Sequence, residues 1–371
     1  MAQWIGSREV AFILASAPEL PPPPADWEAK ARDRVFYSAS GGDLRSYIRT
    51  VSYGKARLLG DIYGPYPVVA KRPDGSWDIG NAMDQAVAAA VATGLVNGVN
   101  YFCVIFTDHP GPSWAFWSAA GGRCYVDMPD PLGAYAMENL HVLTQFPDLY
   151  GVADSPGGFD VMDCACGTHP SAFTKLNFGW LDPSEVVTVA AGAPSHSQPI
   201  HALSSPLPAA PTPGRAHAIK APSTSPQRYY LIEARLRTDV YESSTPDVSS
   251  GLPAEGLVVY WIDETAWPPV HLRKVLSNIG DSYADTSQGL SVTLDAEIPL
   301  GLVARVDRGE PAECNWIRDQ LADIEAEIAD LQQELQHAAP GEKAQIVAQI
   351  RRLQAQARIL RERGRHLACA L

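Results

Sequence analysis

The chain has 371 residues, of which 46 % are hydrophobic and 19 % charged, and this balance is that of an ordinary globular protein with room for two or three domains. Its formal net charge is −13, which argues against nonspecific binding to nucleic acid. Nothing in the sequence approaches the roughly 18 consecutive apolar residues of a membrane-spanning helix, so we expect no nucleic-acid partner and no membrane partner.

The first apolar run, Val10 to Ala15, predicts a buried strand. It is too short for the core of a signal peptide, and Glu9 directly precedes it. The cysteines are too few and too scattered in a chain of this length to indicate a disulfide framework. Both features favour a cytoplasmic location, with secretion as the alternative if a leader is missing. The cysteines are Cys103, Cys124, Cys164, Cys166, Cys314 and Cys369.

The stretch from Val35 to Tyr66 predicts a capped helix followed by a strand. Asp43 is a residue type that caps helix N-termini, and the residues after it place their apolar side chains on one helix face. From Lys55 to Ile62 the residues alternate as they do in a half-buried strand. The apolar helix face holds Leu44, Tyr47, Ile48 and Val51.

A second helix is predicted between Asp78 and Leu95, and a central strand after it. The run Tyr101 to Phe106 is continuously β-branched and aromatic, which is typical of a strand buried on both faces. Asp108 and His109 follow at its end, where loops often carry function, so they are candidates for a substrate cleft; the alternative is a loop that only turns. The helix face expected to pack on the sheet holds Ala86, Val87, Ala90 and Val91.

The stretch from Met137 to Gly151, MENLHVLTQFPDLYG, resembles the zinc-binding helix of a metalloprotease with one ligand missing. Such a helix needs H-E-x-x-H, because residues four apart aim two imidazoles at one metal while the Glu activates the metal-bound water. Glu138 and His141 hold the second and fifth places, and Met137 holds the first. A lone E-x-x-H is a weak signal, so its meaning depends on the flanking sequence. Pro147 and Gly151 are expected to end the helix.

Residues 158–182 read GFDVMDCACGTHPSAFTKLNFGWLD. This segment resembles the one behind the zinc helix of the immune inhibitor A-like metallopeptidases, where a Trp/Phe-Asp-x-Met run is followed by His-Pro-Ser-Ala, a Lys and Leu-Gly-Trp. Residues 35–66 are similar to the N-terminal part of the same family in their Gly-Asp-Leu-Arg-Ser-Tyr, Val-Ser-Tyr-Gly-Lys and Gly-Asp-Ile-Tyr-Gly runs.

The resemblance implies peptide hydrolysis at a zinc ion held by three protein ligands, with Glu138 taking the proton from its water. It also implies that Met162 lies beneath the metal as a Met-turn, and we place Met162, Tyr150 and His109 in the cleft. The sequence departs from the family at three places. Met137 replaces the first His, Thr144 replaces a Gly, and Asp148 falls one residue later than the acidic third ligand.

These departures make a conventional zinc site doubtful. A thioether is a poor zinc ligand beside N and O donors, although it suits Cu(I). A bulge at the helix end would still let His141 and Asp148 face a common point, and His109 is a candidate third ligand. The C-x-C-x-x-H spacing of Cys164, Cys166 and His169 superficially suits a soft metal, but the resemblance gives this His a structural role.

From about residue 184 the chain changes to short apolar strands broken by Pro, Ser and Gly, which predicts an all-β part. Residues 228–236 and 251–265 are similar to the β-domain of the metallopeptidase family. Glu233 and Asp263 lie in these strands. They are candidates for a cation site, but we favour polar members of apolar strands.

The last sixty residues predict an antiparallel coiled-coil hairpin. Apolar residues recur at heptad spacing on both sides of Pro340 and Gly341, which we expect to break the helix. The first arm is mostly acidic and the second mostly basic, so the facing arms should attract each other. Two helices cover each other's seam only in part, so we expect the hairpin to pack on the rest of the chain or to pair with a second copy. A homodimer through this hairpin is therefore a candidate assembly. The heptad residues are Ile317, Leu321, Ile324, Ile328, Leu331, Leu335, Ile346, Ile350, Leu353, Ala357 and Leu360.

Together these patterns predict an α+β protein. The expected parts are a metallopeptidase-like domain with a mixed sheet and a zinc-type helix (1–185), a β-sandwich-like domain (186–312) and the helical hairpin (313–371). For function we expect a divergent metallopeptidase-like hydrolase with Glu138 as general acid/base. The alternatives are a pseudopeptidase that binds a peptide or small molecule without turning it over, and an assembly protein that acts through its hairpin.

Overall fold

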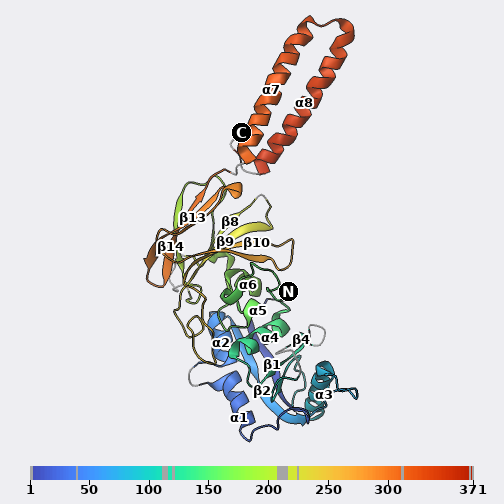
Figure 1. Cartoon of the computed structure of the whole chain (residues 1–371), viewed down its shortest axis with the longest axis vertical. Helices are drawn as coiled ribbons and strands as arrows, with labels where there is room; N and C mark the ends of the chain where they lie inside the picture. The colour runs from blue at the N-terminus through green and yellow to red at the C-terminus, as the bar shows by residue number, and fades with distance from the viewer. Residues whose placement is uncertain are drawn as a thin grey trace.

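A computed structural model describes residues 3–38, 41–110, 116–118, 122–206, 216–223, 225–310, 313–366 and 369. It is a mixed α+β structure in which an N-terminal sheet, two further sheets and a pair of C-terminal helices follow one another along the long axis (Figure 1). Among the described residues, the helices that are long enough to cross a bilayer are not apolar enough to do so.

The N-terminal sheet has five strands in the order β2-β1-β3-β5-β4. All neighbours are parallel except β4, which runs antiparallel to β5 at the edge. The carboxyl ends of β3 and β5 therefore meet at one edge of the sheet. The strands are β1 (Gly6–Ser16), β2 (Ala56–Pro67), β3 (Tyr101–Phe106), β4 (Phe116–Ser118) and β5 (Arg123–Asp127).

Helices cover both faces of this sheet, because β1 is apolar on both sides. Phe12 and Leu14 join the core beneath α2 and α4, whereas Ala11 and Ile13 face α3 on the other side. The π-helical turn η1 (Asp33–Tyr37) follows the first helix. The helices are α1 (Trp27–Arg32), α2 (Leu44–Val51), α3 (Ile79–Ala92) and α4 (Leu132–Thr144).

The predicted cap and apolar face of α2 are confirmed, and the predicted face of α3 is confirmed in part. The Asp43 carboxylate accepts a hydrogen bond from the Ser46 N–H at 2.8 Å, and all four apolar residues predicted for α2 are buried. Asp78 likewise caps α3. The buried face of α3 is shifted from the predicted one, since Val91 is 44 % exposed and the sheet contacts Ala82, Met83, Ala86 and Ala90.

After α4 the chain forms short helices and then two sheets. The short helices are η3 (Gly157–Phe159), α5 (Val161–Cys164), α6 (Ala172–Phe178) and η4 (Pro183–Glu185). One sheet has the order β11-β10-β9-β8-β6 and the other β12-β13-β14-β7. Their strands are β6 (Val186–Thr188), β7 (His196–His201), β8 (Ala218–Pro222), β9 (Arg228–Arg235), β10 (Gly256–Asp263), β11 (Val270–Leu276), β12 (Ser282–Asp285), β13 (Leu290–Ile298) and β14 (Gly301–Arg308), with η5 (Thr286–Gln288) between β12 and β13.

The five-stranded sheet is buried on both faces. Ile232 and Val259 on one face pack against the four-stranded sheet. Leu231 and Tyr260 on the other face join the same core as α2 and α4. The β-rich part and the N-terminal part therefore share one continuous apolar core across position 185.

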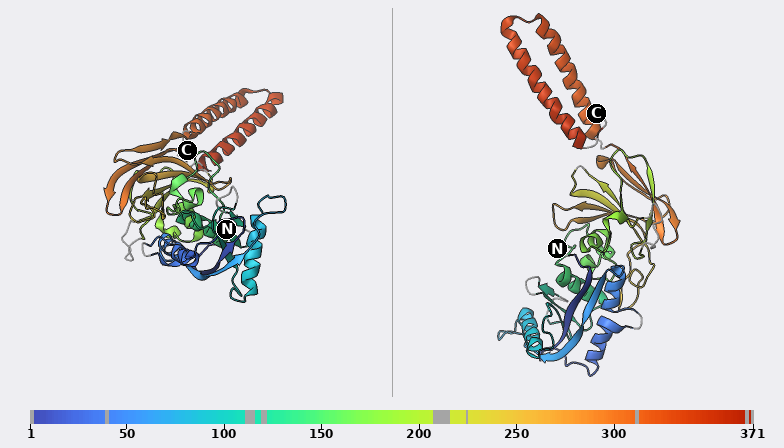
Figure 2. Two further views of the ribbon diagram at one scale, coloured as in Figure 1. Left: turned by 60° about the horizontal axis from the view of Figure 1, so that its bottom comes forward. Right: turned by 180° about the vertical axis from the view of Figure 1, so that it is seen from behind.

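The two C-terminal helices, α7 (Glu313–His337) and α8 (Pro340–His366), pack together as a hairpin that projects from the rest of the molecule (Figures 1 and 2). Opposite charges meet between the arms as predicted, with Arg361 2.5 Å from Glu325. We expected Pro340 to lie in the turn between the helices, but it is the first residue of α8. Proline is tolerated at this position because the first N–H of a helix has no partner within the helix.

The cysteines pair more than the sequence suggested. A disulfide joins Cys314 to Cys369 at the base of the hairpin, and a second joins Cys164 to Cys166, so our expectation of no disulfide framework is wrong for these four residues. An antiparallel hairpin returns Cys369 to the start of α7, so the heptad pattern together with the cysteine positions already allowed this pairing.

A buried ion network fixes the five-stranded sheet to the segment after α4. Arg235 of β9 is 1 % exposed and lies 3.0 Å from Glu233 and 2.7 Å from Glu242. Its guanidinium also donates to the backbone carbonyls of Phe159 and His169. Because all these groups are out of water, removal of the arginine would leave two buried carboxylates without a counterion.

We predict that Arg235→Met destabilises the protein by about 3–5 kcal/mol in urea unfolding, the usual cost of breaking a buried ion pair. Arg228→Met is the matched control on the same strand, since Arg228 is 48 % exposed in its pair with Asp263. We expect the control to lose at most about 1 kcal/mol. Equal losses in the two variants would contradict a special role for the buried network.

Candidate functional site

Helix α4 carries the residues on which the functional prediction depends, and all of them are buried. It follows β5 and packs against α2, α5 and β5 (Figure 1). Glu138 and His141 lie one turn apart and so share a helix face. A helix enclosed in this way holds both side chains in a water-poor environment.

Glu138 is a buried carboxyl group with an unused oxygen. Its side chain is 8 % exposed, and Oε2 has no hydrogen-bond partner among the described residues. Burial is the main cause that raises the pKa of Glu138 to about 7; His141 opposes the shift, and the negative charges of Asp148 and Asp130 add to it. A carboxyl group with this pKa can give or take a proton near neutral pH.

His141 lies between two acceptors. Its Nδ1 is 2.5 Å from the carbonyl oxygen of Phe146, and its Nε2 is 2.9 Å from a carboxylate oxygen of Asp148. A carbonyl oxygen can only accept, so Nδ1 donates to it. The contact at Nε2 is then favourable with a second proton on the ring or with a cation shared with Asp148. The structure thus brings His141 and Asp148 together despite the one-residue slip.

The helix ends differently from the prediction, and this ending aligns Asp148. We expected Pro147 and Gly151 to stop the helix, but α4 ends at Thr144, and Gln145 adopts a left-handed conformation with φ of 57°. That conformation costs a non-glycine residue roughly 1 kcal/mol. The early turn gives the chain room to bring Asp148 back over His141.

Met162 of α5 and Tyr150 of the segment after α4 differ in burial. Met162 is fully buried, and its carbonyl accepts a hydrogen bond from Leu149 N–H at 2.9 Å, so it supports the loop from below. Tyr150 is 52 % exposed. Desolvation and a hydrogen bond with Asp148 raise its pKa to about 12, which keeps the phenol protonated as a donor.

The residues around Glu138 do not fit a conventional hydrolytic zinc ion. His141 and Asp148 offer an imidazole and a carboxylate on the same side, which are two strong ligands. Met137 is buried at the position of the third ligand and offers only a thioether. Two strong ligands and one weak one do not make the three-ligand site that the metallopeptidase pattern requires.

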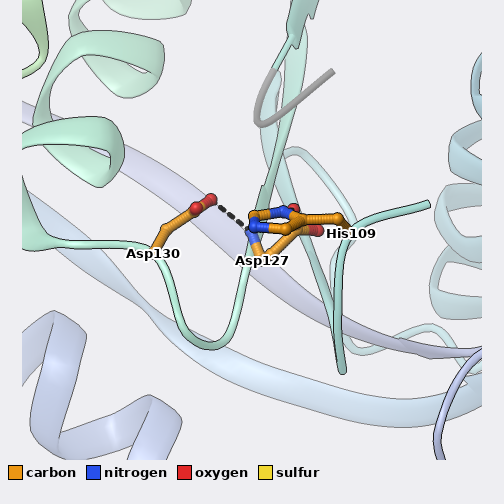
Figure 3. Close-up of side chains that lie close together, drawn as sticks. All are labelled: His109, Asp127 and Asp130. Atoms are coloured by element: carbon orange, nitrogen blue, oxygen red, sulfur yellow. Dashed lines mark hydrogen bonds and ion pairs between the residues drawn. The ribbon is translucent and has the colours of Figure 1, made fainter. Parts of the chain in front are cut away.

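His109 lies in a second group, with two aspartates that the sequence analysis did not single out. His109 Nδ1 contacts Asp127 Oδ2, and one ligand atom from each of His109, Asp127 and Asp130 lies within 4.8 Å of the others (Figure 3). Burial raises the pKa of Asp127 to about 7 and of Asp130 to about 6. Sequence reasoning missed Asp127 and Asp130 because only the pairing of β3 with β5 brings them beside His109.

The soft-metal candidate is contradicted. Cys164 and Cys166 form a disulfide and have no thiolate to offer. The His169 ring is already occupied, with Nε2 2.8 Å from Asp239 and Nδ1 3.1 Å from Lys175 Nζ. This His therefore has a structural role.

The strand carboxylates also have protein partners. Glu233 accepts hydrogen bonds from Ala172 N–H and the Tyr260 hydroxyl besides pairing with Arg235. Asp263 pairs with Arg228. Both act as the polar strand members that we favoured over a cation site.

A cleft of about 760 Å³ opens beside the ends of β3 and β5. It is lined by residues next to the His109 group and by charged residues of the first helices. Asp108 lies in its wall. Its lining includes Lys30, Arg34, Thr107, Asp108, Met128 and Pro129.

Comparison with profiles of protein families and with curated proteins gives no match. The resemblance to the immune inhibitor A-like metallopeptidases therefore rests on the sequence motifs alone.

We predict that Glu138→Gln changes how stability depends on pH. A carboxyl group with a folded pKa of about 7 and an ordinary value of 4.5 stabilises the fold below pH 4.5, and this contribution is lost as the pH rises through 7. The glutamine variant lacks this loss, so relative to wild type it should gain up to roughly 3 kcal/mol between those limits. Urea unfolding across pH measures the difference.

Glu255→Gln is the control for this measurement, because Glu255 is 45 % exposed in a surface pair with Arg237. Its stability relative to wild type should hardly change with pH. If the Glu138→Gln difference were equally flat, Glu138 would not titrate near neutrality.

Proposed function

We propose that this protein is a divergent relative of the immune inhibitor A-like metallopeptidases, with their mixed sheet and a β-sandwich-like second domain, and that Glu138 acts as general acid/base in hydrolysis of a peptide or peptide-like substrate. The observation that carries the proposal is the buried Glu138 carboxyl group, whose Oε2 has no partner among the described residues and whose pKa is about 7. General acid/base groups work best with a pKa near the operating pH.

The chain's own residues supply three parts of such a reaction. Glu138 would take a proton from water and return it to the leaving amine. The Asp148 carboxylate lies 2.9 Å from the His141 ring and adds a hydrogen-bond acceptor to the site. Tyr150, protonated and half exposed, offers a hydrogen-bond donor to a developing oxyanion. Because His141, Asp148 and Met137 do not form a three-ligand zinc site, these side chains would have to act without a zinc ion.

A pseudopeptidase that only binds its ligand is the second candidate. The contact between His141 and Asp148 favours it, because these two groups already satisfy each other at 2.9 Å. The low exposure of Glu138 points the same way, since a catalytic group must reach its substrate. In this case the cleft beside Asp108 would hold a peptide or small molecule.

Assembly through the hairpin is a third candidate, and it is compatible with either of the others. Trp316 is 48 % and Ile359 64 % exposed, and both line a groove of about 430 Å³ along α7 and α8. A second copy of the hairpin has the heptad pattern needed to cover them.

The first test measures hydrolysis of a mixed peptide library near neutral pH together with the metal content of the purified protein. We predict turnover that falls at least about 100-fold in Glu138→Gln, the lower range for loss of a general acid/base. Glu255→Gln is the surface control and should keep full activity. Absence of turnover in wild type, with peptide binding equal in wild type and Glu138→Gln, would support the pseudopeptidase instead.

The second test measures solution mass by light scattering. If the hairpin joins two copies, wild type has twice the chain mass, and Ile359→Glu with Trp316→Ala gives the single-chain mass because a charge is buried at the seam. Gln333→Glu, a surface change on the same hairpin, should leave the mass of wild type. A single-chain mass for wild type would reject the assembly role.

A further inference from the structure

His109, Asp127 and Asp130 lie close together at the edge of the N-terminal sheet where β3 and β5 end (Figure 3). We propose that these three side chains bind a divalent first-row transition metal ion, such as Zn²⁺ or Mn²⁺. This site does not depend on Glu138 or on the proposed hydrolysis.

The backbone holds the two aspartates in a fixed turn. Asp130 Oδ2 accepts the Asp127 N–H at 2.8 Å, and the Asp130 N–H donates to the Asp127 carbonyl at 3.0 Å. The Tyr135 hydroxyl donates to the same carbonyl at 3.2 Å. Met128 N–H donates to Phe106 on the neighbouring strand at 2.9 Å. A turn fixed on all sides presents its carboxylates without a large loss of entropy on binding.

Two buried carboxylate oxygens in this group favour the binding of a cation. Asp127 is fully buried and Asp130 is 1 % exposed, and Oδ1 of each has no hydrogen-bond partner among the described residues. Native proteins rarely leave such atoms unsatisfied, because each costs roughly 1–3 kcal/mol. A single cation coordinated by both Oδ1 atoms and by the neighbouring imidazole would satisfy the two oxygens together.

The donor set selects the class of metal. One imidazole nitrogen and two carboxylate oxygens suit Zn²⁺, Mn²⁺ or Fe²⁺, whereas Ca²⁺ and Mg²⁺ prefer oxygen ligands alone. No sulfur is present in the group, so a soft ion such as Cu(I) is disfavoured. Three protein ligands also leave coordination positions for water or for a ligand from the cleft.

An ion can reach this point from outside. The His109 side chain is 34 % exposed, and the residues flanking the ligands, Asp108, Met128 and Pro129, line the cleft of about 760 Å³. The ion would therefore lie in the wall of the cleft, with its open positions accessible to a bound anion or carbonyl oxygen.

The experiment titrates metal-free, full-length protein with Zn²⁺ and with Mn²⁺ by calorimetry near neutral pH, with a Co²⁺ absorption spectrum to report the ligands. We expect one saturable site with an N/O-type Co²⁺ spectrum. His109→Gln and Asp130→Asn should each lose at least roughly 100-fold in affinity, since even groups that only support metal ligands are worth about 10- to 100-fold.

Asp148→Asn is the control, because Asp148 belongs to the His141 pair and not to this group. Asp148→Asn should bind the metal with unchanged affinity. In thermal melting, the metal should raise the Tm of wild type and of Asp148→Asn but not that of His109→Gln or Asp130→Asn. The His109 side chain is partly exposed, so we expect His109→Gln to fold. This variant therefore still tests the site if Asp130→Asn fails to fold. Absence of saturable binding in wild type, or loss of binding in Asp148→Asn with retention in His109→Gln, would overturn the proposal.

Discussion

The arrangement around α4 depends on the buried ion pairs and hydrogen bonds of the Arg235 guanidinium. By donating to the carbonyls of Phe159 and His169, the guanidinium fixes both ends of the segment that holds Met162. The Met162 carbonyl in turn accepts from Leu149, next to Asp148. A strand of the second part of the molecule thus sets the position of a carboxylate beside His141 in the first part.

This dependence gives the molecule two polar groups along one helix. The Asp130 group precedes the start of α4, and the pair of His141 and Asp148 lies at its end, with Glu138 between them. Asp130 and Asp148 both act electrostatically on Glu138. A cation at the first group would therefore alter the field at Glu138, and the two proposals can be tested separately although their charges interact.

Local signals predicted the elements well. Asp43 and Asp78 cap their helices because a short acidic side chain satisfies free N–H groups wherever a helix starts. The central position of Tyr101–Phe106 followed from its unbroken apolar run. The buried face of α3 was shifted because alanine and valine are similar in apolarity, and only the shape of the sheet decides which of them it contacts.

The site was predicted only where residues are close in sequence. His141 and Asp148 lie on either side of the end of α4, and motif spacing placed them together. The group of His109, Asp127 and Asp130 was predicted only in part. Its residues come together across the parallel strands β3 and β5, and the sequence does not show how these strands pair. The role of Arg235 was not visible either, since its partners come from segments far apart along the chain.

The opposite charges of the two hairpin arms favour one relative orientation of two neighbouring hairpins. Since α7 is mostly acidic and α8 mostly basic, the hairpin has an electric polarity across its width. A neighbour placed in the same sense, acidic arm beside basic arm, is attracted, whereas arms of equal sign repel. Added salt would weaken that preference between copies while the apolar seam within each hairpin stays closed.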